Sequence, residues 1–329
     1  AVAASPGGTA IVVPVYRGAS TLAAAVNALL TQKPSPPERV IVVDDASPDD
    51  SLAIARALAA RFPGRIEVIE RLGNGGEAAA LNEGFRLAAI HAADLIGIVE
   101  ADVVVAPDWL ARLTALLDRS GAGVWGVGGA LKPFPGDPWP ARLAGYEVQD
   151  RQASQSDGEV RHISSANVLY RRRAWEEAGP FREDLVNASL DSDFNLRLQE
   201  RGGRLAWDPD AVAWHHYKPC VAGWMARTFA YARTRCRVSA LALYPGDREA
   251  AARLPLDLAA CSALLWGWAF PQTAGILVVS VLLLRLPDAR RVLRERRDLA
   301  GFLLPPVLLL RGAVAAAGLA VGLLEEPVS

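Results

Sequence analysis

Cysteine and histidine are scarce in this chain of 329 residues, which contains three cysteines and four histidines. Cys220, Cys236 and Cys261 lie far apart and are odd in number, which fits neither a disulfide framework nor a zinc site. A reducing compartment is therefore expected. The formal net charge of -1 gives no overall attraction to nucleic acid, so we expect no nucleic-acid partner. Residues 1–9 lack the basic and apolar regions of a secretory signal, and export is not expected.

Charged residues are missing from a long stretch in the last quarter of the sequence. Leu258–Leu284 is an uncharged run of 27 residues, and Leu299–Leu324 contains Arg311 as its one charged residue. A helix needs about 20 apolar residues to cross the hydrocarbon core of a bilayer. We therefore predict transmembrane or membrane-embedded helices over residues 254–329. The alternative is a helical pair that is buried in a soluble core.

The topology of this region depends on the basic loop between the two runs. Arg285–Asp298 contains six arginines and three acidic residues, so the positive-inside rule places this loop in the cytosol. Pro271 and Gln272 interrupt the first run. A single span would put the loop across the membrane from the preceding domain, whereas a turn back near Pro271 would keep both in the cytosol. We favour this hairpin and predict a cell-membrane protein whose preceding domain faces the cytoplasm.

A further apolar pattern lies just before the uncharged run, in residues 221–253. Apolar side chains recur there at helical spacing, and arginines lie mostly off that stripe. The stripe consists of Val221, Trp224, Met225, Thr228, Phe229, Ala232 and Cys236, and the arginines are Arg227, Arg235 and Arg237. This pattern is typical of a helix at the membrane surface. An ordinary amphipathic helix that packs on the domain is the alternative.

Residues 1–220 alternate between short apolar runs and helical patterns. We expect strands at residues 10–15, 40–43, 66–69 and 95–99, and helices at residues 21–30, 52–61, 77–90 and 194–201. Alternation of short Val/Ile-rich strands with helices predicts an α/β domain whose mostly parallel sheet is covered on both faces. Ligands of such sheets bind beyond the carboxyl ends of the strands.

Acidic residues follow the second expected strand. Asp44 and Asp45 end this strand, and Ser47 with Pro48 then forms a helix-start signal that has Asp50 near the capping-box position. Helix capping explains part of this acidity but does not require Asp44 and Asp45. Two adjacent carboxylates at a strand tip can accept hydrogen bonds from a base or a ribose, and we favour that interpretation.

Two more elements follow expected strands. Gly73–Gly84 is a glycine-rich turn that leads into a helix, where free amides can approach a phosphate or a sugar. It matches neither a Walker loop nor the dinucleotide fingerprint. Glu100 and Asp102 close the strand at residues 95–99 with one residue between them, so both carboxylates can reach one site. Hard divalent cations prefer such oxygens and share them with substrate phosphates.

Together these elements resemble the inverting family 2 glycosyltransferases, which implies their A-type fold with a Rossmann-like, mostly parallel mixed sheet. The resemblance extends over about residues 10–217. It rests on eight motifs that follow the family's order: Val13-Pro14-Val15-Tyr16, Val43-Asp44-Asp45-Ala46-Ser47, Gly73–Gly84, Glu100-Ala101-Asp102, Ser165-Ala166-Asn167 with Tyr170-Arg171-Arg172, Gly179-Pro180-Phe181, Leu190-Asp191-Ser192-Asp193-Phe194 ahead of Arg197-Leu198, and Pro209-Asp210-Ala211-Val212 before His215. With the C-terminal apolar helices, the chain looks most like the membrane-anchored, succinoglycan-type polysaccharide glycosyltransferases.

The resemblance implies roles for the matched positions. Asp191 is expected to be the catalytic base, and Asp102, with His215 as a further ligand, is expected to bind Mn²⁺ or Mg²⁺. Nucleotide-sugar contacts are expected from Pro14, Val15, Tyr16, Asp44, Asp45, Gly73, Asn82, Glu100, Ala101 and Asp102. Acceptor contacts are expected from Ser165, Asn167 and Asp193.

The implied reaction is transfer of a sugar, with inversion, from a nucleoside diphosphate sugar to a lipid-linked or membrane-proximal glycan. UDP is the favoured nucleotide. A metal would neutralise the diphosphate while one base takes the proton of the acceptor hydroxyl. Two departures from the family pattern, Glu100 in place of Asp and Leu190 in place of Glu, suggest the alternative of a sugar-nucleotide-binding membrane scaffold with weakened catalysis. A sugar-phosphate nucleotidyltransferase is a further alternative, although Pro14–Ser20 offers only Arg17 to hold a triphosphate.

Overall fold

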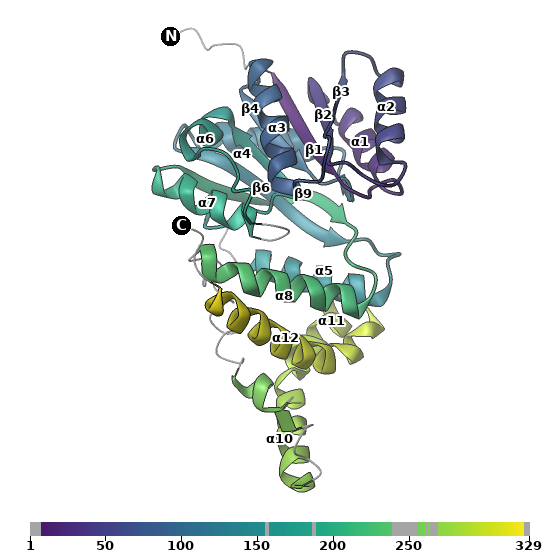
Figure 1. Cartoon of the computed structure of the whole chain (residues 1–329), viewed down its shortest axis with the longest axis vertical. Coiled ribbons are helices and arrows are strands. Elements are labelled where there is room, and N and C mark those ends of the chain that lie inside the picture. Colours follow the sequence, from purple (N-terminus) through teal and green to yellow (C-terminus); the bar gives the residue numbers. More distant parts are fainter. Residues whose placement is uncertain are drawn as a thin grey trace. The chain divides into compact units, whose positions relative to one another are not determined.

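The computed structural model describes residues 8–154, 158–185, 189–238, 255–260, 262–263 and 269–325. The chain divides into two compact units, drawn in Figure 1. The first unit contains Ala1–Lys132 and Gln155–His215, and the second contains Pro133–Ser154 and His216–Ser329. The second unit therefore includes a segment from within the predicted domain of residues 1–220.

The first unit begins with the strand and helix alternation that the sequence predicts. Its first seven elements are β1 (Thr9–Val15), α1 (Leu22–Leu30), β2 (Arg39–Asp44), α2 (Ser51–Arg61), β3 (Ile66–Glu70), α3 (Glu77–Ile90) and β4 (Leu95–Val99). The predicted elements are confirmed here, because every boundary lies within one residue of its expected position.

The rest of the first unit adds five described strands and three helices. These elements are β5 (Val103–Val105), α4 (Trp109–Arg119), β6 (Val124–Pro133), β7 (Gly158–Val160), β8 (Asn167–Arg171), α6 (Arg172–Ala178), α7 (Leu190–Glu200) and β9 (Arg204–His215). The helix predicted at residues 194–201 begins earlier, at Leu190, directly after Ser189 with a φ of 65°. Asp191 and Asp193 therefore lie in the first turn of α7, where the helix dipole favours negative charge.

The nine strands of the described residues form one mixed sheet. Its order is β3-β2-β1-β4-β8-β6-β9-β5, with β7 paired to β9. The pairs within β3-β2-β1-β4 are parallel, whereas β8 runs antiparallel to both β4 and β6, and β9 runs antiparallel to β5 and β7. Val15 lies beside Asp44, and Asp44 lies beside Glu70. The polar segments that follow these strands therefore begin at one edge of the sheet.

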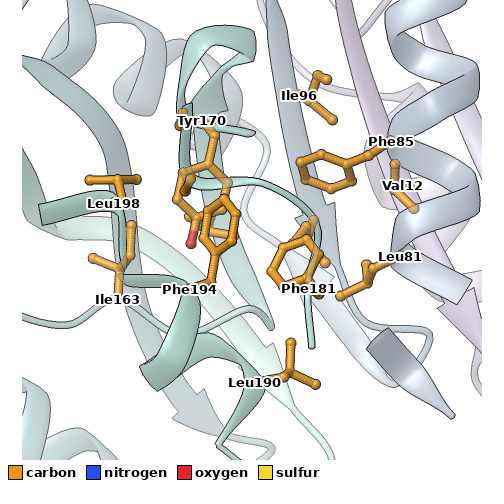
Figure 2. Packing of buried hydrophobic residues seen from close by; sticks show 14 of the residues in the cluster. Val12, Leu81, Phe85, Ile96, Ile163, Tyr170, Phe181, Leu190, Phe194 and Leu198 are labelled. Carbon is orange, nitrogen blue, oxygen red and sulfur yellow. The ribbon is translucent and has the colours of Figure 1, made fainter. Parts of the chain in front are cut away.

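An aromatic cluster joins α3 to α7 over this sheet (Figure 2). Phe181 stacks on Phe194 of α7 with ring centroids 4.4 Å apart, and it meets Phe85 of α3 edge-on at 5.4 Å. Tyr170 of β8 meets Phe194 edge-on at 5.1 Å. Leu190, which stands where the resemblance expects Glu, is 3% exposed and belongs to this cluster. The start of α7 is thereby held by apolar packing.

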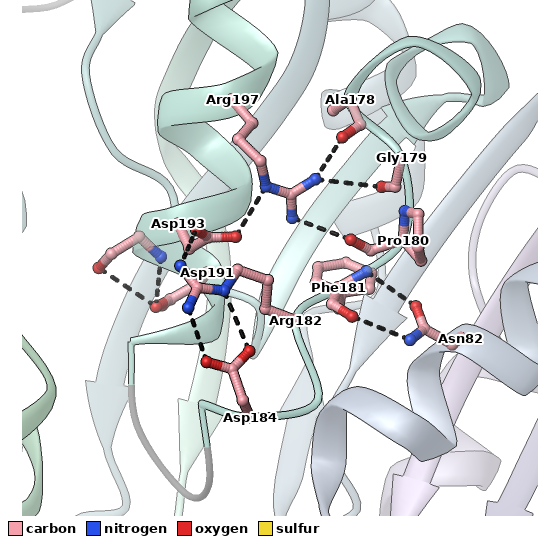
Figure 3. A network of polar contacts seen from close by, with 11 residues as sticks. Asn82, Ala178, Gly179, Pro180, Phe181, Arg182, Asp184, Asp191, Asp193 and Arg197 are labelled. Atoms are coloured by element: carbon pink, nitrogen blue, oxygen red, sulfur yellow. Dashed lines mark hydrogen bonds and ion pairs between the residues drawn. The ribbon is translucent and has the colours of Figure 1, made fainter. Parts of the chain in front are cut away.

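Polar side chains tie the segment before α7 to its neighbours (Figure 3). The Asn82 amide of α3 donates to the Phe181 carbonyl at 3.0 Å, and its oxygen accepts from the Phe181 N–H at 2.8 Å. The Arg197 guanidinium of α7 donates to the carbonyls of Ala178 and Pro180 and to the Asp193 carboxylate. Asn82 is 1% exposed, so its amide serves this internal connection.

The second unit is helical over its described residues. Its elements are α5 (Trp139–Ala153), α8 (Val221–Val238), α10 (Pro271–Leu284), α11 (Leu286–Glu295), η1 (Leu299–Leu303) and α12 (Leu304–Leu324). Leu299–Leu324 is the one described helix that is long and apolar enough to cross a membrane. Residues 239–253 of the predicted surface helix region, and residues 261 and 264–268 of the uncharged run, lie outside the described residues.

Helix α8 confirms the amphipathic helix predicted from residue 221, and its apolar side packs on other helices of this unit. Trp224 and Met225 are buried in a cluster with residues of α5 and α12. Gly318 of α12 lies so close to α8 that an added Cβ would be 2.6 Å from the Phe229 carbonyl oxygen. The described part of the stripe is therefore largely covered by protein.

Replacing Asn82 with alanine should lower the stability of the first unit. The substitution leaves the N–H and the carbonyl of Phe181 buried without their partner, and each unpaired group costs about 1–3 kcal/mol. We expect the free energy of unfolding, measured by guanidinium denaturation, to fall by about 2–4 kcal/mol. Arg86→Ala, at an exposed position of the same helix, should change it by less than about 0.5 kcal/mol. Equal effects of the two substitutions would contradict this role of Asn82.

Candidate active site

The two adjacent carboxylates at the end of β2 have different surroundings. Both oxygens of Asp45 accept hydrogen bonds from the glycine turn, from Gly75 N at 2.9 Å and Gly76 N at 2.8 Å. Asp45 also forms an ion pair with Arg71, and it is 3% exposed. Asp45 therefore fixes the predicted glycine-rich turn against the strand edge.

Arg71 is a residue of this edge that the sequence reasoning missed. It follows β3 and pairs with both Asp45 and Glu83, the latter at 2.8 Å. Partial burial alone would lower the pKa of Arg71, but its hydrogen bonds to Glu83 and Asp45 raise it, so the guanidinium stays charged. In the sequence, the position of Arg71 next to the glycine turn was the one available indication of this role. The ion pair could not be foreseen, because Asp45 lies 26 residues away along the chain.

Asp44 differs from Asp45 in that one of its carboxylate oxygens accepts no hydrogen bond from the described residues. Its Oδ2 accepts from Ser47 N at 3.1 Å, whereas its buried Oδ1 accepts no hydrogen bond from the residues that the structure describes. Tyr16 follows β1 at the same edge and is 46% exposed, while Pro14 and Val15 are buried. Gly73 is exposed in the turn after β3. The edge thus presents a carboxylate oxygen, an aromatic ring and an open glycine.

Glu100, Asp102 and His215 come together beyond the end of β4. His215 Nε2 lies 3.7 Å from Glu100 Oε2 and 3.4 Å from Asp102 Oδ1. The register explains this proximity, because Val103 of β5 lies beside His215, the last residue of β9. Ala101, between the two acids in sequence, is buried at 8% exposure.

These three side chains fit a divalent cation. Each offers one ligand atom, and the three atoms lie within 4.8 Å of one another. Two carboxylates and one imidazole form a donor set that suits Mn²⁺, and carboxylates together with substrate phosphates suit Mg²⁺. Glu100, in place of the family's usual Asp, still reaches the group. The structure therefore brings the two predicted ligands, Asp102 and His215, to one point and adds Glu100.

Asp191 lies in the first turn of α7 and faces His162. Its Oδ1 accepts from Ser192 N at 2.8 Å, and its Oδ2 lies 3.5 Å from His162 Nε2. Both side chains are nearly enclosed, with exposures of 9% for Asp191 and 7% for His162. Burial, with a smaller contribution from the charge of Asp191, raises the pKa of the Tyr170 hydroxyl well above its usual value. Sequence reasoning missed the His162 contact with α7, because Ser192, which His162 also contacts there, lies 30 residues away along the chain.

The Asp193 carboxylate forms ion pairs with two arginines. It pairs with Arg197 at 2.8 Å and with Arg182 at 3.6 Å, and Arg182 also binds Asp184 (Figure 3). A side chain held by two guanidinium groups contributes first to the position of α7. The two acids of this turn are thus separated by their surroundings, with Asp193 paired to cations and Asp191 beside an imidazole.

The predicted acceptor residues before β8 differ in access. Ser165 Oγ donates to Glu77 Oε1, at the start of α3, over 3.3 Å. Asn167 is 0% exposed, and its amide bonds the Trp109 indole and the carbonyls of Ala130 and Ala211. Asn167 therefore holds the middle of the sheet together and cannot touch an acceptor in this conformation. Its position is still informative, because it lies beside Val99, one residue before Glu100.

Loss of the Asp102 carboxylate should weaken Mn²⁺ binding. In the presence of UDP, we expect Asp102→Asn to raise the Kd for Mn²⁺ at least about tenfold, equivalent to about 1.4 kcal/mol, because one of three ligand atoms becomes neutral. Free Mn²⁺ can be measured by electron paramagnetic resonance. Asp210→Asn provides the matched control, since this acid lies on the same strand as His215 and is 74% exposed. Equal Kd values for wild type and Asp102→Asn would exclude the site.

Sequence comparison places the chain among known enzymes. Residues 10–179 match the family described as glycosyl transferase family 2. The succinoglycan biosynthesis protein ExoU of Rhizobium meliloti is 39% identical over 215 residues, which are 61% of this chain and 60% of that protein. The pre-mycofactocin glycosyltransferase of Mycobacterium tuberculosis is 28% identical over 298 residues, 87% of this chain and 57% of that protein. The chain thus spans less than two thirds of the length of these relatives.

Structural comparison agrees with this placement at the level of the fold. The mannosyltransferase PcManGT from Pyrobaculum calidifontis, solved in complex with GDP-Man and Mn²⁺, superposes with a TM-score of 0.63 and 21% sequence identity. The superposition covers 96% of this chain and 89% of that one. The family match spans more than half of the chain and contains Asp44, Glu100 and Asp102, whereas Asp191 and His215 lie after it. The chain belongs to glycosyl transferase family 2 and is a glycosyltransferase with the A-type fold.

Proposed function

We propose that this glycosyltransferase moves a hexose-like sugar, with inversion, from a nucleoside diphosphate sugar to a lipid-linked or membrane-proximal glycan in a reaction that requires a divalent cation. UDP is the first candidate nucleotide. The observation that carries the proposal is the convergence of Glu100, Asp102 and His215 at the strand edge that also bears Asp44 and Tyr16. The family assignment favours this activity over the nucleotidyltransferase alternative.

The donor half of the site follows from the strand edge. Asp44 Oδ1, buried and without a hydrogen-bond donor among the described residues, can accept from a base or a ribose. The exposed Tyr16 ring can cover an aromatic base. Glu100, Asp102 and His215 would hold the cation, which neutralises the charge that develops on the diphosphate leaving group.

The acceptor half is proposed to centre on Asp191. The acceptor hydroxyl oxygen forms a bond to the sugar C1 as the bond from C1 to the diphosphate oxygen breaks, and the hydroxyl proton passes to Asp191. Ser192 N donates to Asp191 Oδ1 at 2.8 Å, and Asp191 Oδ2 lies 3.5 Å from His162 Nε2. Asn195 of α7 donates to the Ile163 carbonyl at 2.7 Å, which joins α7 to the segment that leads to Asn167 beside β4.

Substitution of the base should act on the chemical step. We expect Asp191→Asn to lower kcat about 10²–10⁴-fold, because asparagine cannot accept the hydroxyl proton, while KM for the donor changes little. The assay measures transfer or hydrolysis from a panel of nucleotide-sugars, including UDP- and GDP-sugars, with Mn²⁺. Glu200→Gln, an exposed position on the same helix, should leave kcat unchanged. Full activity of Asp191→Asn would remove this base, and binding of donor without turnover by the wild type would favour the scaffold alternative.

A further inference from the structure

The two ends of the uncharged run Leu258–Leu284 meet in the structure. Asp257 immediately precedes the run and Arg285 immediately follows it. Arg285 Nη2 lies 2.5 Å from Asp257 Oδ2, and the exposures of the two side chains are 10% and 3%. A buried ion pair of this kind requires both partners, since an unpaired buried charge is costly. The chain therefore leaves one point after Asp257 and returns to the same point at Arg285.

Helix α10 forms the returning arm and leaves apolar side chains uncovered. Ile276, Val279, Leu283 and Leu284 are 69%, 54%, 56% and 52% exposed, whereas Ala274 and Val281 are buried. With 14 residues, α10 is about 21 Å long at about 1.5 Å per residue. This is shorter than the roughly 30 Å of hydrocarbon that a spanning helix must cross. The helix is long enough to enter one leaflet and too short to reach the other interface.

Helix α12 has the composition of a transmembrane helix, but ion pairs and charged groups contact it at several points. Arg311, near its middle, pairs with Glu147 of α5 at 2.5 Å, and its neighbour Gly312 lies against the Asp257 carboxylate. Glu325, just after the helix, pairs with Arg233 of α8. A transmembrane path would place the Arg311 and Asp257 pairs deep in the hydrocarbon core, where charged groups are disfavoured.

The basic loop is held in the same way. Asp150 of α5 pairs with Arg296 at 3.0 Å and with Arg291 at 3.4 Å. Arg142 of α5 binds Asp298 through two hydrogen bonds, and this guanidinium lowers the pKa of the Asp298 carboxyl. Five residues, 134–138, separate the end of β6 at Pro133 from the start of α5 at Trp139. These five residues are too few to cross a bilayer, so α5 and its arginine partners lie on the same side of the bilayer as β6.

We propose that α10 inserts its exposed apolar side chains into one leaflet of a lipid bilayer. The chain enters and leaves that leaflet from one side of the bilayer, which is the side on which β6 lies. The occupant of the exposed α10 surface is thus lipid acyl chain. The charge-free run of 27 residues between the ion-paired ends favours hydrocarbon over a soluble partner. Helices α11 and α12 stay on the same face, so the membrane is not crossed by the described helices. This inference refines the membrane-proximal acceptor of the proposed function, but it concerns attachment and not catalysis.

Cysteine labelling of the full chain in sealed vesicles tests the path. Single cysteines are introduced at exposed positions, as Arg119→Cys in the catalytic unit, Arg290→Cys in the basic loop and Leu324→Cys at the end of α12. The native Cys220, Cys236 and Cys261 are replaced by serine. A membrane-impermeant maleimide should label all three positions in vesicles of one orientation and none in the opposite orientation. Opposite labelling of positions 119 and 290 would show a single crossing within residues 258–284, and opposite labelling of positions 290 and 324 would show that α12 crosses; either result overturns the proposal.

Vesicle flotation tests the lipid contact. The double substitution Val279→Asp with Leu283→Asp alters exposed side chains, so it should preserve folding, and it should reduce flotation with phosphatidylcholine vesicles at least tenfold. Leu72→Asp, at a position that is 104% exposed in the first unit, is the matched control and should float like the wild type. Unchanged flotation of the double variant would contradict lipid insertion. Both readouts are independent of sugar transfer, so they can fail while the transferase assay succeeds, and the reverse.

Discussion

The parallel register of β1 with β2 and β4 is the constraint on which the candidate site depends. Val12 and Ile41 are completely enclosed and lie beside each other, so a slip of one residue would turn enclosed side chains to the opposite face of the sheet. With the register fixed by this apolar packing, Val15 and Asp44 must end side by side. The polar residues that follow the strands are therefore gathered at one edge by the burial of the residues that precede them, and the antiparallel pairing of β5 with β9 adds His215 from far along the chain.

Electrostatics then separates similar carboxylates into those that are paired with arginines and those that face an imidazole. A buried carboxylate is tolerated when cations or N–H groups pair with it. Asp45 and Asp193 satisfy this condition with arginines, and they hold the glycine turn and the start of α7 in place. Asp102 instead faces an imidazole and a second carboxylate, and Asp191 faces His162. Two acids adjacent or nearly adjacent in sequence thus acquire different roles because their neighbours in space differ.

This division marks the limit of what could be predicted. The element boundaries of residues 9–99 followed from local apolar periodicity. The expectation that Asp102 and His215 lie together followed from motifs whose order is typical of the family. The sequence could not show that Asp44 and Asp45 have different surroundings. The partners of Asp45 are Arg71 and two backbone amides, which lie 26 to 31 residues away along the chain. It could not show that the Asn82 amide binds a backbone segment 99 residues away, or that Asn167 is sealed inside the sheet. Side-chain roles that depend on distant partners require the fold.

The same limit explains why composition alone could not decide the membrane topology. An apolar run shows only that its side chains are unfavourable in water. Both Leu258–Leu284 and Leu299–Leu324 are long enough for a transmembrane helix. A transmembrane helix has its two ends on opposite sides of the membrane, whereas a hairpin has both ends on one side. The charged residues next to an apolar run show where its ends lie. The Asp257–Arg285 pair brings the ends of the first run together, and the pairs of Arg311 and Glu325 attach α12 to the polar helices α5 and α8. The ion-paired ends therefore supply the topological information that the apolar composition of the two runs does not contain.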